Sequence, residues 1–360
     1  MTERLLHTAA TRFEAARRVD SAPPGHRSGR LHGHGFIASV HAVLPAGVGG
    51  FAGAEVGALR DALIAAVEPL DYRHLNEILA QTGDAPLAAW IRARLAIPGV
   101  AAVGLQSTPD EGVELDGGGR ARCWRRYRLQ SAHRLPHVPP GHKCGRVHGH
   151  GFEVVLQANA DGSGLAPGIL DAAWQALHAE LDHAYLNDIP GLENPTSEIL
   201  CGWIWRRLKP ALATLAWVTV FETGQSGASH DGERFRIWKD VTLDSATCLP
   251  AAPAGDRRRR VHGHTYTLRL SLEAPLDAVL GWTVDFGDVK ERFNPVFEAL
   301  DHRPLHELMG PGQADAGSLV RWIRIEAARR LPELVQVELY EEPGCGAMLC
   351  WGAALPALPL

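Results

Sequence analysis

One tripeptide, His-Gly-His, occurs three times in this chain of 360 residues and constrains its fold more than any other feature. The copies begin at His32, His148 and His262, which lie 116 and 114 residues apart, so the chain repeats itself at the size of a domain. An alternating apolar run follows each copy, a pattern that is typical of a β-strand. Alternate side chains of a strand share one face and lie about 6.6 Å apart, so each tripeptide presents two imidazoles together as a chelating pair.

The repeat divides the chain into three units, which we place at residues 1–117, 118–231 and 232–360. The first boundary falls in the flexible glycine run Asp116–Gly119, and the second lies near residues 229–233. The same elements follow one another in each unit: a strand, a loop rich in proline and glycine, the His-Gly-His strand, a helix, a loop that contains aspartate, a second helix and a final strand. This order predicts an α+β unit whose helices pack on one face of an antiparallel sheet.

The middle unit shows these elements most clearly. Apolar residues with helical spacing predict a helix over 172–181. A second helix is expected to begin where Thr196 or Ser197 can cap its free N–H groups and Glu198 suits the positive end of its dipole. The alternating segment 217–222 predicts a strand near the end of this unit.

Composition excludes several classes of function. The formal net charge of −5 argues against a nucleic-acid-binding surface as the main function. No apolar stretch is long enough to span a bilayer, and the N-terminus is too charged for a secretory signal. The six cysteines are dilute and lack CxxC pairing, which favours a reducing compartment with free thiols. We therefore expect a cytoplasmic protein that binds neither nucleic acid nor membranes.

The three units differ when they are aligned on His-Gly-His. Only the middle unit has a third histidine, His133, in the preceding strand, and a thiol, Cys144, in the glycine-rich loop before His148. Three imidazoles with an open fourth position are the ligands of a catalytic zinc, so His133, His148 and His150 are predicted metal ligands. Cys144 could be a fourth ligand. Its loop suits a base or nucleophile better, with Lys143 and the metal lowering its pKa.

The middle unit resembles the 6-pyruvoyl-tetrahydropterin synthase family, and within it the 6-carboxytetrahydropterin synthases of 7-deazaguanine (queuosine) biosynthesis. Three residues separate Cys144 from His148, as in the carboxy type, whereas the pyruvoyl type typically has a longer gap. The related folate-pathway type carries a glutamate in this loop, which is absent here. The outer units match the family only in the order of their elements. The motifs that carry the resemblance are Ser131–Pro139, Lys143–His150, Leu181–Glu198 and Phe221–Thr223.

The resemblance implies a role for the metal centre and its neighbours. The three histidines of the middle unit would hold Zn²⁺, which acts as a Lewis acid on the substrate's side-chain oxygens. Cys144 would be the general base that moves protons at the adjacent carbons, working with an Asp-His pair that matches Asp182 and His183. In such a pair the carboxylate orients the imidazole and stabilises its charged form.

The resemblance also implies a substrate and a way of holding it. Glu222 would anchor the pterin by accepting two parallel N–H bonds from its 2-amino-4-oxo edge. Thr196 and Ser197 either contact the pterin as well or serve as helix caps alone. The implied reaction converts 7,8-dihydroneopterin triphosphate to 6-carboxy-5,6,7,8-tetrahydropterin, with release of acetaldehyde and triphosphate.

The outer units differ in whether they could supply an Asp-His pair to the site of the middle unit. In the family, three such units join into a twelve-stranded barrel with active sites between neighbours, so this chain is expected to close a pseudo-trimeric barrel alone. The first unit has Asp71-Tyr72 at the Asp-His position and Gln106 at the anchoring position, so it looks inactive. The third unit keeps Asp301-His302 and Glu341. Either Asp301-His302 completes the middle site, or Asp182-His183 serves from a second chain or has a structural role.

Several alternatives stay open from the sequence. Arg257–Arg260 replaces the Cys144 loop in the third unit and is either a solvated loop or a contact for the substrate's triphosphate. His32, His34, His262 and His264 are expected to be structural remnants, since each outer unit keeps only two ligands. Other functions on the same scaffold are a pyruvoyl-type or sepiapterin-cleaving enzyme and a non-catalytic pterin- or zinc-binding scaffold. A dimer of chains is a further possibility.

Overall fold

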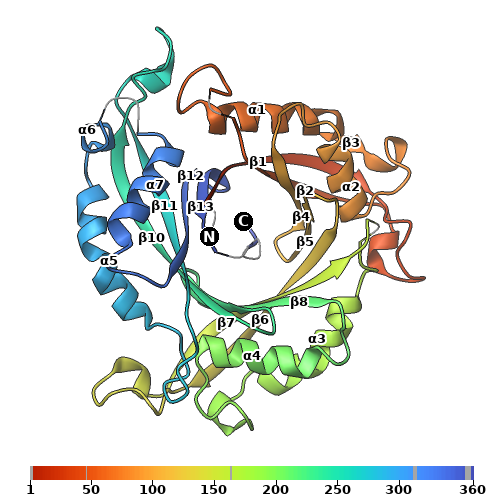
Figure 1. Ribbon diagram of the computed structural model, residues 1–360. Helices are drawn as coiled ribbons and strands as arrows, with labels where there is room; N and C mark the ends of the chain where they lie inside the picture. Colours follow the sequence, from red (N-terminus) through yellow and green to blue (C-terminus); the bar gives the residue numbers. More distant parts are fainter. Residues whose placement is uncertain (1–2, 46, 163, 311–313, 353–357) are drawn as a thin grey trace.

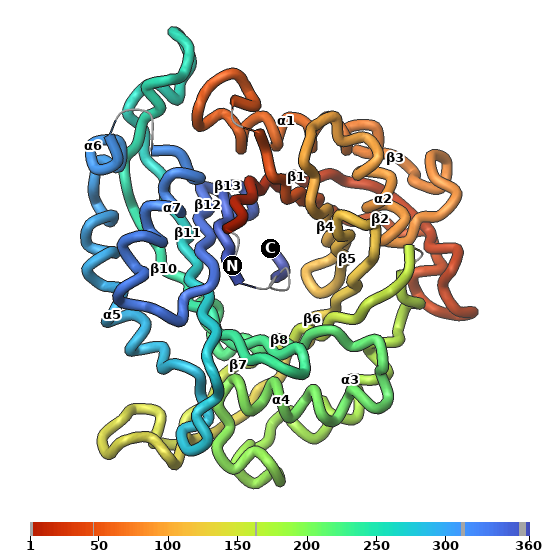
Figure 2. Tube along the Cα trace, in the orientation of Figure 1, coloured from red at the N-terminus to blue at the C-terminus, as the bar shows by residue number. Residues whose placement is uncertain are grey.

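The computed structural model describes residues 3–45, 47–162, 164–310, 314–352 and 358–360. Within these residues, thirteen strands form one sheet, and twelve of them close into an antiparallel barrel with the helices outside it (Figures 1 and 2). The ring closes because β1 (Arg4–Arg17) pairs with β13 (Cys345–Cys350) at the other end of the sequence. The remaining strand, β3 (Arg73–His74), is short and pairs in parallel with β1.

Each third of the chain contributes four consecutive barrel strands. The first third contains β1, β2 (His32–Ala42), β4 (Val100–Thr108) and β5 (Glu111–Asp116), with helices α1 (Glu55–Val67) and α2 (Asp84–Arg92). The second contains β6 (Ala121–His133), β7 (His148–Ala160), β8 (Leu215–Thr223) and β9 (Ser226–His230), with α3 (Ile169–Leu181) and α4 (Ser197–Leu208). The third contains β10 (Phe235–Thr247), β11 (His262–Glu273), β12 (Leu334–Glu342) and β13, with α5 (Phe286–Leu300), α6 (Leu305–Leu308) and α7 (Ala316–Ala327).

The helices cover the outside of the barrel with their apolar faces. On α3 the predicted stripe of Trp174, Leu177 and Leu181 is buried in the core that the second and third units share. The first unit has a separate core beneath α1 and α2. The predicted α+β class and the closed twelve-stranded barrel are therefore confirmed. Among the described residues, every helix is too short or too polar to cross a membrane.

Both predicted unit boundaries lie in turns between paired strands. The Asp116 carboxylate accepts hydrogen bonds from the N–H groups of Gly118 at 2.8 Å and Arg120 at 3.0 Å, between β5 and β6. The glycine run is thus a tight turn rather than the flexible segment that its composition predicted. Asp231 binds the N–H groups of Glu233 and Arg234 in the same way between β9 and β10. The sheet consequently runs from one unit into the next without a linker.

Candidate metal centre and active site

Two paired strands bring the three predicted metal ligands together. His133 at the end of β6 lies directly opposite His148 at the start of β7, and His150 follows two residues later on the same face. The ring centroids are 4.5 Å apart between His133 and His148, 5.1 Å between His148 and His150, and 5.2 Å between His133 and His150. The three imidazoles therefore form one cluster, as the sequence predicted.

The Nδ1 atoms of two of these histidines are hydrogen bonded to backbone carbonyl groups, which leaves their Nε2 atoms available to a metal. His133 Nδ1 lies 3.0 Å from the Pro195 carbonyl oxygen, and His148 Nδ1 lies 2.8 Å from that of Arg146. A carbonyl only accepts, so each Nδ1 carries the proton and each Nε2 keeps a lone pair. Within the described part of the chain, Nε2 of His133 and of His150 is buried without a hydrogen-bond partner. Burial lowers the pKa of His133 and His150, which keeps both rings in the neutral, metal-binding form.

Glu222 lies beside these histidines at the end of β8. One ligand atom from each of His133, His148, His150 and Glu222 lies within 4.8 Å of the others. Glu222 Oε1 is 3.4 Å from His150 Nε2, and Oε2 accepts a hydrogen bond from the Ser197 hydroxyl at 2.6 Å. Imidazole nitrogen and carboxylate oxygen are both ordinary zinc ligands, so the set fits Zn²⁺. The sequence assigned Glu222 to the substrate alone, and the structure adds the metal as a second possible partner.

The two hydroxyl groups predicted near the substrate are already hydrogen bonded within the protein. Thr196 caps α4, since its hydroxyl oxygen accepts the Ile199 N–H at 3.2 Å, and the same hydroxyl donates to the Gly281 carbonyl. Ser197 is buried and donates to Glu222. Thr196 therefore joins α4 to the third unit, and Ser197 positions the Glu222 carboxylate.

Cys144 lies in a short 3₁₀ turn, Lys143–Gly145, in front of β7. The turn is capped by His142, whose Nδ1 accepts the Cys144 N–H at 3.2 Å. Burial and the negative charge of Glu222 raise the pKa of the Cys144 thiol, while Lys143 acts in the opposite direction. The sequence predicted a pKa lowered by Lys143 and the metal. The effect of Lys143 has the predicted sign, but burial of the thiol outweighs this single ammonium group.

The third unit supplies the opposite wall of the middle site. His142 Nε2 lies 3.8 Å from Asp285 Oδ2, and the His142 ring faces Trp282 with centroids 6.2 Å apart. The buried Glu198 carboxylate accepts the Thr283 N–H at 2.7 Å. Trp282, Thr283 and Asp285 all precede α5, and Asp285 is its N-cap residue. The middle site therefore lies between the second and third units. No spacing in the sequence identifies these wall residues.

The two Asp-His pairs have closely matching geometries. The histidine Nδ1 lies 2.9 Å from the aspartate Oδ2 in Asp182-His183 and 2.7 Å in Asp301-His302. Both histidines have a positive φ, 57° and 55°, and their side chains are 79% and 77% exposed. The other carboxylate oxygen accepts a backbone N–H, from Gln130 on β6 for the first pair and from Asp244 on β10 for the second. The bond to Asp301 raises the pKa of His302.

The outer units lack the third histidine. Arg17 lies opposite His32, and Thr247 lies opposite His262, in the position that His133 has opposite His148. Among the residues that the structure describes, the cluster around His133 is the only group of three or more His, Cys, Asp or Glu side chains close enough to share a metal ion.

One sequence-based alignment of the first unit is wrong. Gln106 lies opposite Ile37, which corresponds to Phe221 opposite Glu153, so Ser107 occupies the position of Glu222. Ile37 and Gln106 lie 69 residues apart in the sequence, whereas Glu153 and Phe221 lie 68 residues apart, so equal spacing from His-Gly-His selects Gln106 instead of Ser107. The assignment of Glu341 to this position in the third unit agrees with the register, in which Tyr340 lies opposite Thr267 and a bulge follows.

Ser107 and its partner reveal a change that the sequence did not predict. The Ser107 hydroxyl donates to Asp84 Oδ2 at 2.7 Å, and Asp84 Oδ1 lies 2.6 Å from Arg17 Nη1. Asp84 begins α2 as Ser197 begins α4. The first unit therefore has the serine on the strand and the carboxylate on the helix, the reverse of the middle unit, and its carboxylate is paired with Arg17.

Comparisons with known proteins identify a family for this chain. The family model described as 6-pyruvoyl tetrahydropterin synthase matches residues 122–233 and 236–350. The 6-carboxy-5,6,7,8-tetrahydropterin synthase of Synechocystis sp. is 35% identical over 122 residues, which cover 31% of this chain and 93% of the relative. The dihydroneopterin monophosphate aldolase of Pyrococcus furiosus is 29% identical over 94 residues, 25% of this chain and 79% of the relative.

Solved structures align with parts of the chain at low sequence identity. The 6-pyruvoyl tetrahydropterin synthase of Caenorhabditis elegans aligns with 33% of this chain and 95% of its own, at 16% identity and a TM-score of 0.30. A urate oxidase from Bacillus sp. TB-90 aligns with 60% of this chain and 84% of its own, at 8% identity and a TM-score of 0.32. Because the family model matches twice and covers more than half of the chain, including the histidine cluster and its third-unit wall, this chain belongs to the 6-pyruvoyl tetrahydropterin synthase family.

Proposed function

We propose that this chain is a zinc-dependent 6-carboxy-5,6,7,8-tetrahydropterin synthase, a carbon–carbon lyase of 7-deazaguanine (queuosine) biosynthesis. It would convert 7,8-dihydroneopterin triphosphate and water to 6-carboxy-5,6,7,8-tetrahydropterin, acetaldehyde and triphosphate. The observation that carries the proposal is the histidine cluster, in which the buried Nε2 atoms of His133 and His150 have no hydrogen-bond partner among the described residues. The 35% identity to the Synechocystis synthase supports the same reaction.

The middle unit would hold both the metal and the pterin. His133, His148 and His150 would bind the zinc ion, which would supply Lewis-acid activation of the substrate's side-chain oxygens. We assign Glu222 to the pterin, since a carboxylate accepts two parallel N–H bonds from the 2-amino-4-oxo edge. Ser197, hydrogen bonded to Glu222 Oε2, would fix the orientation of that carboxylate. Retained zinc with weakened pterin binding in Glu222→Gln supports this role, and loss of zinc identifies Glu222 as a metal ligand.

The proton transfers would use one group from each side of the site. Cys144 would act as the base, and Asp301-His302 would be its partner, because contacts across the middle site come from the third unit. Asp182 follows α3 and is hydrogen bonded to Gln130 of β6, which adjoins the first unit in the strand order, whereas Asp301 is hydrogen bonded to Asp244 of β10, which adjoins β9 of the second unit. We therefore propose that the third unit is kept because it completes the middle site. By the same alignment, the first unit would be a degenerate synthase-like unit.

The test compares wild type with Cys144→Ala for zinc content and for acetaldehyde released from 7,8-dihydroneopterin triphosphate. Wild type should bind zinc and form acetaldehyde in equal amount to 6-carboxytetrahydropterin, and Cys144→Ala should keep the zinc and lose turnover. Cys350→Ala, which removes another partly buried thiol, is the control and should keep both. Loss of zinc in Cys144→Ala would make the thiol a ligand. Pterin binding without acetaldehyde in zinc-loaded wild type would indicate a scaffold, and a pyruvoyl product would indicate the other enzyme type.

A further inference from the structure

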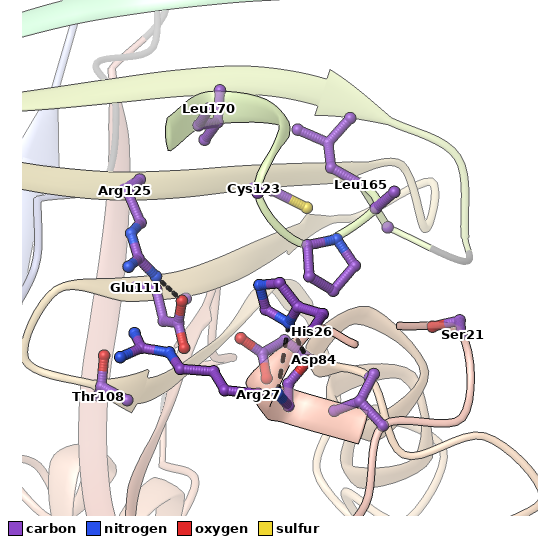
Figure 3. Close-up of a pocket in the computed structure, with 18 of the residues that line it drawn as sticks. Ser21, His26, Arg27, Asp84, Thr108, Glu111, Cys123, Arg125, Leu165 and Leu170 are labelled. Carbon is purple, nitrogen blue, oxygen red and sulfur yellow. Dashed lines mark hydrogen bonds and ion pairs between the residues drawn. The ribbon is translucent and has the colours of Figure 1, made fainter. Parts of the chain in front are cut away.

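A second cavity lies between the first and second units, with a volume of about 600 Å³. Arg17, His32 and His34 line it, so it corresponds in the first unit to the metal centre of the middle unit. Figure 3 shows its two sides, with His26 and Arg27 of the first unit facing Cys123 and other residues of the second. The cavity is thus a separate site from the one proposed for catalysis.

Arg17 makes this cavity unsuited to a metal ion but suited to an anion. Its side chain is only 4% exposed, and its permanently charged guanidinium replaces a neutral imidazole ligand. Nη1 donates to the Thr82 carbonyl at 2.9 Å and pairs with Asp84. Arg17 Nε is buried and has no hydrogen-bond partner within the described residues. A buried unpaired donor in a cavity wall costs free energy that a ligand acceptor would recover.

The charged residues of the cavity leave an excess of positive charge. All three of its carboxylates are ion-paired, Asp84 with Arg17, and both Glu111 and Asp171 with Arg125. Arg27 and Arg30, in the turn before His32, also line the cavity and are exposed. Neither forms an ion pair in the part of the chain that the structure describes. The two unpaired guanidinium groups and Arg17 Nε together offer more hydrogen-bond donors than one carboxylate group of a ligand could accept.

The wall from the second unit is mainly apolar. Trp124, Leu165, Pro167 and Leu170 line this side. Cys123 lies among them, and burial raises the pKa of its thiol to about 11, so the thiol adds no negative charge at neutral pH. Such a surface favours the flat or hydrocarbon part of a ligand, because it removes apolar area from water on binding.

We propose that this cavity binds a small organic phosphate. Its phosphate oxygens would accept hydrogen bonds from Arg27, Arg30 and Arg17 Nε, and its ring would lie against Trp124. The cavity carries Ser28 where the middle unit has Cys144, and it lacks the third histidine, so the ligand would be bound without being converted. The site is independent of the proposed synthase reaction.

The test measures binding of guanosine triphosphate, guanosine and inorganic triphosphate to the full chain by equilibrium dialysis. The variant Arg27→Ala/Arg30→Ala removes both free guanidinium groups. Its matched control is Arg257→Ala/Arg260→Ala, which changes the same two positions of the equivalent 3₁₀ turn in the third unit. All four side chains are exposed, so both variants should fold normally.

We expect the first variant to lose one bound equivalent of guanosine triphosphate or to bind it about tenfold more weakly, because charge-assisted hydrogen bonds are lost. The control should bind as wild type does, and wild type should bind guanosine at least about tenfold more weakly than the triphosphate. Unchanged binding in the first variant, or an equal loss in the control, would overturn the proposal. Inorganic triphosphate binding as tightly as guanosine triphosphate would overturn the ring contact. Acetaldehyde release should be unchanged in the first variant, which separates this test from that of the synthase reaction.

Discussion

The two Asp-His pairs offer a matched experiment on how the middle site is completed. We replace the histidine by asparagine in each pair, giving His302→Asn and His183→Asn. Asparagine adopts a positive φ more readily than most residues, so it suits backbones at 55° and 57°. Both substitutions remove an exposed imidazole and leave the preceding aspartate, with its backbone hydrogen bond, in place. The two variants differ mainly in which unit loses its histidine.

The expected effects on stability and on catalysis are well separated. The His302 ring is 77% exposed, so its loss should change the free energy of unfolding by no more than about 0.5 kcal/mol. A positioned acid or base typically contributes a factor of about 10² to 10⁴ in rate, which corresponds to roughly 2.7 to 5.4 kcal/mol of activation free energy. A fall of that size in His302→Asn therefore cannot come from unfolding. For His183→Asn we expect a rate within about twofold of wild type, since Asp182 is bonded to β6, which adjoins the first unit rather than the third.

The assay is acetaldehyde release from 7,8-dihydroneopterin triphosphate under saturating substrate, with zinc content and urea unfolding measured on the same samples. His302→Asn should keep its zinc and its unfolding midpoint while kcat falls. A kcat that is preserved in His302→Asn and abolished in His183→Asn would refute the assignment of the pair to the third unit. Equal loss in both variants would also refute it, because the proposal assigns only one of the two pairs to the middle site.

Three further predictions concern the metal, the first unit and the interface between units two and three. His133→Ala should lose bound zinc after dialysis, as measured by atomic emission, because the buried ligand and its carbonyl-fixed ring are both removed. Asp84→Ala leaves the buried Arg17 charge unpaired and should cost about 3 kcal/mol in urea unfolding, near the low end for such a change because Asp84 is partly exposed. Burial raises the pKa of Glu198 to about 7 from 4.5, so the folded state holds a proton that the unfolded state has released between these values. The metal-free protein should therefore lose up to about 3 kcal/mol of stability as the pH rises through this window, and Glu198→Gln should flatten that loss.

The metal cluster was predictable because it depends on strand periodicity. His148 and His150 share a face by alternation, and His133 ends the strand that pairs with theirs, so no long-range information was needed. Alignment by spacing failed at Gln106, because the segment from Ile37 to Gln106 is one residue longer than that from Glu153 to Phe221, which puts Ser107 in the position of Glu222. One extra residue in the segment between two strand positions leaves the apolar alternation of each strand unchanged, so an alignment by equal spacing cannot detect it.

The contacts between units could not be predicted from the sequence. Trp282, Thr283 and Asp285 lie in a loop with no periodicity, and they reach the middle site because β10 pairs with β9 and brings the third unit beside the second. The exchange of hydroxyl and carboxylate between Ser107 and Asp84 joins residues on different elements. Each such pair depends on the packing of a helix end against a strand, which residue types alone do not determine.

The closure of the barrel within one chain has a genetic consequence. If three copies of one short gene product formed such a ring, every substitution would appear at all three sites at once. Here each wall is encoded by its own stretch of sequence, and β1 meets β13 only after all three stretches have been translated. A change such as histidine to arginine at position 17 can therefore occur without any change at position 133. One gene can in this way keep the residues of one site while those of a neighbouring site change independently.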